Sequence, residues 1–238
     1  MNSIYLLLLL PLLFSSRCLA DYGNYCSTNN NITSTTQNKN INSLLSQIVQ
    51  KTEDSYFTAV SYGEGKNRVY GLAQCRLDES FTFCASCIQN ATEVITSLCP
   101  GQADVRLWYG FDDCFLRYSN EDFFGVVDTS TDASIIFANR DNVSHPHAFY
   151  KVLNALFHKI DLEALQPTNK FFAKGKAKVS SKETIYARVQ CTEDLSPSSC
   201  SQCLTIAIGN FQGGFCSKSQ GCQELYSSCF VRYELYAF

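Results

Sequence analysis

Two Cys-x2-Cys pairs are the residues of this chain whose type and spacing could carry chemistry. They are Cys84 with Cys87 and Cys200 with Cys203. Two such pairs have the spacing of a four-cysteine zinc site, and each alone has the spacing of a redox dithiol. Both interpretations need free thiols, so the bonding partners of these cysteines decide between a chemical and a structural role.

Each pair belongs to a longer spacing, Cys-x8-Cys-x2-Cys, which occurs twice. The first copy begins at Cys75 and the second at Cys191, 116 residues later. Cys-Phe-x-Arg-Tyr also occurs twice, at Cys114–Tyr118 and at Cys229–Tyr233. Similarity at a fixed period indicates one domain of about a hundred residues, duplicated.

An apolar run near the N terminus, Ile4–Phe14, is too short to span a bilayer of about 30 Å. Small residues follow at Cys18 and Ala20. We therefore predict that residues 1–20 are a signal peptide and that the mature chain starts at Asp21. Removal of Cys18 leaves twelve cysteines. An even number in an exported chain favours disulfides over zinc or redox thiols.

Cleavage also leaves 18 basic against 22 acidic residues, a net charge of −4. Because there is no basic surplus, nucleic acid is not expected as a partner. No second long apolar segment follows, so we expect no membrane span and a protein secreted to the extracellular space. Three Asn-x-Ser/Thr triplets fit that route and predict glycosylation at Asn31, Asn90 and Asn142.

Hydrophobic periodicity predicts the elements that position the cysteines. In the first repeat we expect two helices and four strands: Ser43–Glu53, Phe83–Leu98, Phe57–Tyr62, Val69–Cys75, Val105–Tyr109 and Cys114–Tyr118. The second repeat follows the same order, with a helical stripe and three strands: Phe149–Ile160, Lys170–Ala173, Ile185–Cys191 and Phe230–Leu235. Its second helix should begin at a Ser196 cap followed by Pro197. For the apolar triplet Ile135–Phe137, two interpretations stay open, an edge strand or a contact between domains.

The repeated cysteine spacing, with Tyr-x3-Gln before it and Cys-Phe-x-Arg-Tyr after it, resembles the plant cysteine-rich repeat secretory proteins. Their unit is the ginkbilobin-2-homologous domain, and the resemblance covers nearly all of the mature chain. It implies an α+β fold of two tandem domains, each a five-stranded antiparallel sheet packed by two helices and stapled by three disulfides. We place the domains at 22–126 and 132–238, with a linker at 127–131.

The family pairs its first half-cystine with the fifth, the second with the third and the fourth with the sixth. In the first repeat this implies Cys26–Cys99, Cys75–Cys84 and Cys87–Cys114. The second repeat lacks the first half-cystine and has an extra one, Cys222. Two bridges carry over and one remains: Cys191–Cys200, Cys203–Cys229 and Cys216–Cys222.

The resemblance also implies a sugar site, known from an antifungal mannose-binding lectin of the family. It consists of an Asn just after the first half-cystine, an Arg six before the last and a Glu five after the last. The first repeat has Ser27, Trp108 and Ser119 at those offsets, or Arg106 in the arginine place if two extra residues shift it. The second has Gln223 and Glu234. With at most one triad member in each repeat, we expect weak or no mannose binding, and we expect Glu234 and Arg232 on an exposed strand face.

Asp78 and Asp194 recur at a strand exit before a helix, where we expect them to cap that helix. No cysteine is left as a nucleophile and no catalytic motif occurs, so we expect neither an enzyme nor a metal or cofactor. The sequence thus predicts a secreted, non-catalytic two-domain binding protein of the plant apoplast, in defence or signalling, with a carbohydrate or protein ligand. The alternatives are an antifungal mannose-binding lectin and, from another class, an extracellular thiol-redox sensor or enzyme.

Overall fold

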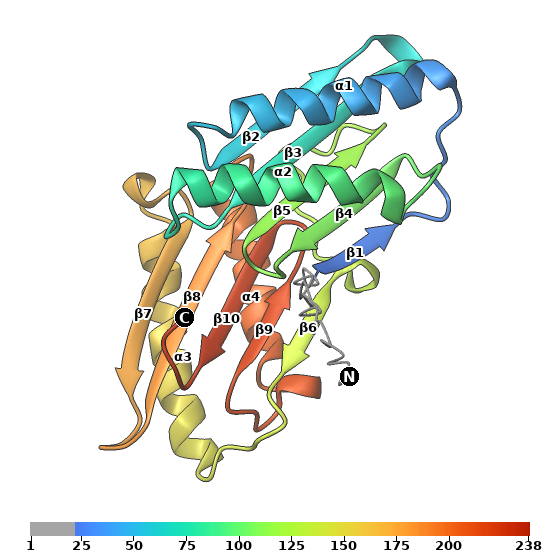
Figure 1. Ribbon diagram of the computed structural model, residues 1–238. Coiled ribbons are helices and arrows are strands. Elements are labelled where there is room, and N and C mark those ends of the chain that lie inside the picture. The colour runs from blue at the N-terminus through green and yellow to red at the C-terminus, as the bar shows by residue number, and fades with distance from the viewer. Residues whose placement is uncertain (1–21) are drawn as a thin grey trace, which may run out of the picture.

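The computed structural model describes residues 22–238, so the expected signal peptide and its cleavage site lie outside the described residues. The chain forms two α+β units, each a five-stranded antiparallel sheet with two helices on one face (Figure 1). The strand order is β1-β4-β5-β3-β2 in the first unit and β6-β9-β10-β8-β7 in the second. Equivalent strands occupy equivalent places, which confirms the predicted fold class and its duplication.

The first unit contains β1 (Tyr22–Cys26), α1 (Thr35–Lys51), β2 (Phe57–Tyr62), β3 (Val69–Cys75), α2 (Phe81–Leu98), β4 (Asp104–Tyr109) and β5 (Cys114–Ser119). The second contains β6 (Ile135–Ala138), α3 (Pro146–Ala164), β7 (Phe172–Lys178), β8 (Thr184–Cys191), α4 (Pro197–Asn210), β9 (Cys222–Leu225) and β10 (Cys229–Glu234). In each unit an apolar core fills the space between sheet and helices.

Two predicted boundaries are wrong for identifiable reasons. Helix α1 begins at Thr35 and not at Ser43, because the Ser34 side chain accepts a hydrogen bond from a backbone N–H in the first turn and caps the helix there. Strand β7 begins two residues after Lys170, because Lys170 and Phe171 have φ angles of 49° and 61°. That left-handed conformation is incompatible with a strand.

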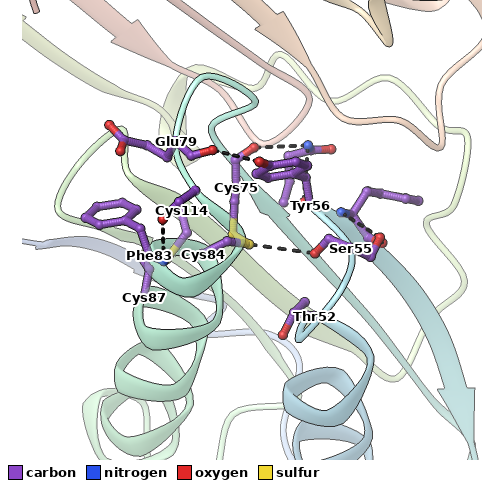
Figure 2. Close-up of a disulfide and its surroundings, with 12 residues drawn as sticks. Thr52, Ser55, Tyr56, Cys75, Glu79, Phe83, Cys84, Cys87 and Cys114 are labelled. Carbon is purple, nitrogen blue, oxygen red and sulfur yellow. Dashed lines mark hydrogen bonds between the residues drawn. A yellow bond between two sulfur atoms is a disulfide. The ribbon is translucent and has the colours of Figure 1, made fainter.

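The Cys-x2-Cys spacing follows from the distance between neighbouring strands. Cys75 of β3 and Cys114 of β5 are register partners across the sheet. Cys84 and Cys87 stand on the same side of α2, one turn apart, at about 5–6 Å. Opposed strand residues are separated by about 4.5–5.5 Å, so each cysteine of the pair reaches a different strand. Figure 2 shows the Cys75–Cys84 bridge at the start of the helix.

The second unit repeats this arrangement, since Cys191 and Cys229 are also register partners. Its bridges, and the remaining one of the first unit, are Cys191–Cys200, Cys203–Cys229, Cys216–Cys222 and Cys26–Cys99. All twelve cysteines of residues 22–238 are therefore paired, in the pattern that the resemblance implies. The Cys-x2-Cys pairs are neither dithiols nor zinc ligands, because their members bond to separate strands.

The sheet faces without helices join the two units. Leu72, Trp108 and Phe115 of the first unit and Leu225 of the second belong to one apolar cluster, which we call the interdomain core. Trp108 is fully buried, and its indole N–H donates to the carbonyl of Tyr226 at 3.3 Å. Covering the bare faces removes large aromatic side chains from water, which is the main favourable term for such a contact.

The apolar triplet of the second repeat is both an edge strand and a contact between the domains. Ile135 to Phe137 lie in β6, the edge strand of the second sheet. Ile135 packs against the interdomain core, and the ring of Phe137 meets that of Phe111 edge-on at 4.3 Å between centroids.

Charged side chains extend the contact beyond the interdomain core. Asp78 pairs with Arg76 of its own unit, accepts from Lys174 Nζ of the second unit at 3.0 Å and lies 3.7 Å from Arg188. Arg188 in turn pairs with Asp112 of the first unit. These ion pairs connect β7 and β8 to the first unit.

The expected capping role of the repeated aspartates is therefore wrong. Ser80 and Ser196 cap α2 and α4, each accepting a hydrogen bond from a backbone N–H in the first turn. Asp78 instead pairs across the interface, and Asp194 accepts from the N–H of Gly125 at 2.8 Å. Both aspartates act between units, because serine already satisfies the helix start.

Burial alone would raise the pKa of Asp78, but hydrogen bonds from Arg76 and Lys174 and the charge of Arg188 outweigh it and lower the pKa to about 2. A depressed folded-state pKa means that the carboxylate stabilises the fold above about pH 4 and loses this effect as the pH falls towards about 2. We predict that Asp78→Asn lowers the free energy of unfolding by on the order of 1–2 kcal/mol near neutral pH. In urea titrations the difference from wild type should shrink between about pH 4 and pH 2.

The matched control is Asp132→Asn, an exposed aspartate with no ion pair among the described residues, which should change stability little. A loss at Asp78 that is equally large at all pH values would contradict the ionic explanation.

The second prediction concerns the bridge that is special to the second unit. Cys216 and Cys222 are six residues apart, whereas Cys203 and Cys229 are 26 apart. A smaller loop removes less entropy from the unfolded chain. Replacing both cysteines by alanine should lower the free energy of unfolding by about 2 kcal/mol for the small loop and about 3 kcal/mol for the larger one. Urea unfolding of the two double variants compares them, and a larger loss for the small loop would refute the entropic explanation.

Candidate functional site in a polar pocket between the units

Strand register locates the family's sugar positions in the second unit, where the first half-cystine is absent. In the first unit Cys26 lies opposite Val105 of β4. In the second unit, Cys222 of β9 is equivalent to Val105, because Cys222 pairs with Tyr233 as Val105 pairs with Tyr118. The residue opposite Cys222 on β6 is Ala138. Ala138 therefore takes the place of the missing half-cystine. Asn139, directly after it, takes the place of the family's asparagine.

Asn139 and Glu234 are in contact. The Asn139 amide donates to Glu234 Oε2 at 3.0 Å, and the Arg232 guanidinium donates to Glu234 Oε1 at 3.1 and 3.2 Å. Glu234 is only 5% exposed, so the expected open strand face is wrong. The second unit thus has two of the three family positions, with Gln223 in the arginine place, and the expectation of one is also corrected.

These residues line a cavity of about 270 Å³ between the units. The β4–β5 loop of the first unit supplies one wall and the bare face of the second sheet supplies the other. The lining consists of Gly110, Phe111, Asp112, Phe137, Ala138, Asn139, Gln223, Arg232, Glu234 and Tyr236. Planar polar groups beside aromatic rings suit a sugar, whose hydroxyls take hydrogen bonds while its C–H faces pack on rings.

One guanidinium in the pocket pairs with both of its carboxylates. Arg232 donates to Asp112 at 3.1 Å as well as to Glu234. Burial would lower the pKa of Arg232, but the two carboxylates outweigh it and raise the pKa, so the guanidinium stays charged. Within residues 22–238, the side-chain amide of Gln223 makes no hydrogen bond to protein. The side-chain oxygen of Asn139, Oδ1, also accepts none. Gln223 and Asn139 therefore keep hydrogen-bonding capacity for a ligand in the pocket.

In the first unit, the residue equivalent to Gln223 is already paired with other side chains of the protein. Register puts Arg106 opposite Arg117, as Gln223 is opposite Arg232, so Arg106 holds the arginine place. Its guanidinium lies 3.0 Å from Asp128 and 4.7 Å from the ring centre of Tyr25. The other two family places are serines, Ser27 and Ser119, and Trp108 lies in the interdomain core. Ser27 and Arg106 therefore do not share a site with Glu234.

Three further sequence-based expectations concern glycosylation, metal binding and membrane spans. The asparagines of all three sequons are exposed, and their glycosylation stays a prediction. Within the described residues no three His, Cys, Asp or Glu side chains gather as metal ligands. No helix in residues 22–238 combines the length and apolarity needed to cross a membrane.

Fold and cysteine pairing together define a tandem of two disulfide-stapled α+β domains. The chain superposes on the tandem DUF26 ectodomain of the Arabidopsis thaliana cysteine-rich receptor-like protein PDLP8 with a TM-score of 0.76 and 26% identity, over 90% of this chain and 98% of that one. The equivalent ectodomain of PDLP5 gives 0.71 at 25% identity.

A family model described as salt stress response/antifungal matches residues 25–121 and 137–236, and the chain belongs to this family. It is 46% identical to cysteine-rich repeat secretory protein 55 of Arabidopsis thaliana over 97% of this chain and 88% of that one. It is 34% identical to an antimicrobial ginkbilobin-2-like protein of Castanea crenata, over 99% and 96%. The resemblance drawn from the cysteine spacing is confirmed.

Gly221 is packed directly against the Asn139–Glu234 pair, and a Cβ there would overlap the Glu234 carboxylate and approach Asn139 Nδ2 to 2.5 Å. We predict that Gly221→Ala displaces the pair and lowers the free energy of unfolding by about 1–3 kcal/mol, as overpacking does. Gly213→Ala is the matched control, because a Cβ at Gly213 meets nothing within 4 Å. Equal stability of the two variants in thermal unfolding would show that the pair is not held as described.

Proposed function

We propose that this protein is a secreted, non-catalytic binding protein of the plant extracellular space, acting in defence or signalling, and that it binds a carbohydrate in the pocket between its units. The observation that carries the proposal is the Asn139–Glu234 pair, which stands in the family's sugar position beside the unengaged amide of Gln223. An antimicrobial relative that aligns over nearly the whole chain supports a role in defence.

The hydrogen-bond network decides how a sugar would be held. Glu234 is occupied by Arg232 and by Asn139 Nδ2, so it orients the asparagine and leaves Asn139 Oδ1 free as an acceptor. Gln223 offers two donors and one acceptor. Two adjacent hydroxyls of a ring can thus bind one to each amide, while Phe111 and Phe137 face the apolar side of the ring.

Replacement of the family arginine by Gln223 should make mannose a weak ligand. A hydrogen bond to a charged group contributes roughly 1.5–3 kcal/mol, and a neutral amide contributes less. We therefore predict little heat of mannose binding for wild type and a tightening of about tenfold or more for Gln223→Arg in calorimetry. A gain of affinity is informative because misfolding cannot produce it.

Two further variants place the binding in the second unit. Asn139→Ala in the Gln223→Arg background should abolish the gain, since Asn139 supplies the free acceptor. Ser27→Ala in the same background should leave it unchanged, because Ser27 lies in the first unit at the equivalent position. If Gln223→Arg does not bind mannose more tightly than wild type, the pocket is not a sugar site of the family type.

The same titration separates the proposal from its closest rival. Strong mannose binding by wild type would make the protein a mannose-binding lectin of the antifungal type. The thiol-redox alternative has no support in the described residues, since all twelve of their cysteines are in disulfides.

A further inference from the structure

The edge strand β7 carries a row of lysines on the sheet face that has no helix. Lys174, Lys176 and Lys178 are exposed and alternate along the strand, so they point to one side about 6.6 Å apart. Gly175 between them faces helix α3, where a Cβ would come within 2.8 Å of Ile160. We call the three side chains the lysine row.

Positive charge is concentrated here in a chain that is acidic as a whole. Residues 170–182 contain five of the eleven lysines and no acidic residue, while the formal net charge of the whole chain is −3. Local concentration of one sign attracts ligands of the opposite sign more than the net charge would suggest.

The duplicated fold supplies an internal comparison. Strand β2 is the equivalent edge of the first sheet, because Phe57 pairs with Gln74 as Phe172 pairs with Gln190. In register with that pair, β2 has Ala59 and Ser61 where β7 has Lys174 and Lys176, and all four are exposed. Edge-strand lysines commonly prevent edge-to-edge association. The equivalent edge does without them, so the fold itself does not require the row.

Two members of the row, Lys174 and Lys176, line a second cavity of about 270 Å³, separate from the Asn139 pocket, and Lys178 continues the row beyond it. Lys174 and Lys176 lie beside their register partners Arg188 and Tyr186, and Phe238 completes the lining. The guanidinium carbon of Arg188 lies over the ring of Phe238, 5.3 Å from the centre of that ring. Figure 1 shows the C-terminal end of the chain near β8, and the last two residues, Ala237 and Phe238, line the cavity.

One position of the row already binds a carboxylate. Lys174 Nζ lies 3.0 Å from Asp78 Oδ2 of the first unit. Within residues 22–238, Lys176 and Lys178 have no acidic partner. The row therefore continues a carboxylate-binding surface beyond the one carboxylate that the protein itself supplies.

We propose that the lysine row and its cavity bind a linear acidic polysaccharide, with the carboxylates of successive sugars paired to successive lysines. Regularly spaced, flexible cations suit a polymer whose charge repeats. The rings of Tyr186 and Phe238 give sugar faces a surface to pack on, which an acidic peptide would not use. The site is concave and bounded by Phe238, so it admits a single chain better than a flat bilayer. It shares no residue with the Asn139 pocket, and it is tested independently of the proposed function.

The experiment measures binding of the mature protein to polygalacturonate and to the same polymer after full methyl esterification, by biosensor at several salt concentrations. Wild type should bind the acidic polymer, with affinity that falls as salt rises, and should not bind the esterified one. The double variant Lys176→Gln/Lys178→Gln should bind roughly tenfold or more weakly. Lys39→Gln/Lys66→Gln makes the same charge change at two exposed lysines of the first unit and should bind like wild type.

Four results would overturn the proposal. The first is no binding of polygalacturonate by wild type, and the second is equal binding of the esterified polymer. The third is an equal loss in both double variants, which would assign the effect to net charge. The fourth is tighter binding to polyglutamate or to phosphatidylserine vesicles than to the polysaccharide, which would assign the row to a peptide or a membrane.

Discussion

Each sheet of this protein has helices on one face only, and burial of the other face is the constraint on which the rest of the structure depends. Trp108 and Phe115 lie on the uncovered face of the first sheet, where water would otherwise reach them. The repeated glutamines fit this arrangement. Gln190 donates to the carbonyl of Cys75 at 2.8 Å, and Gln74 accepts from the N–H of Glu193 at 3.2 Å, so each satisfies backbone of the opposite unit.

The two sheets cover one another only in part, and what remains uncovered differs between the repeats. Arg188 of the second unit is equivalent to Leu72 of the first. Arg188 pairs in register with Arg232, and Leu72 pairs in the same way with Arg117. At this position the first unit contributes apolar surface to the contact. The second keeps a charged face, divided by its last residues into the Asn139 pocket and the hollow beside the lysine row.

The order of helices and strands was predictable because hydrophobic periodicity is a local property of the sequence. The cysteine pairing followed only from the resemblance to the family, and the structure gives its physical reason, since the Cys-x2-Cys pair spans one helical turn over two adjacent strands. Asn139 could not be found in this way, since its marker, a preceding half-cystine, is replaced by Ala138, and only the pairing of β6 with β9 reveals the equivalence. The roles of Asp78 and Glu234 were missed for a related reason. Their partners come from the other unit or from a distant strand, and no local pattern encodes such contacts.

Every disulfide closes within its own unit, and this has a consequence for biosynthesis. Both copies contain the Cys-x8-Cys-x2-Cys spacing, so a chain oxidised all at once would offer these cysteines wrong partners of similar local sequence. Synthesis from the N terminus removes that competition, because the first unit contains all six of its own half-cystines and can complete its bridges before the second emerges. Folding from the N terminus thus keeps apart two sets of cysteines that share this spacing.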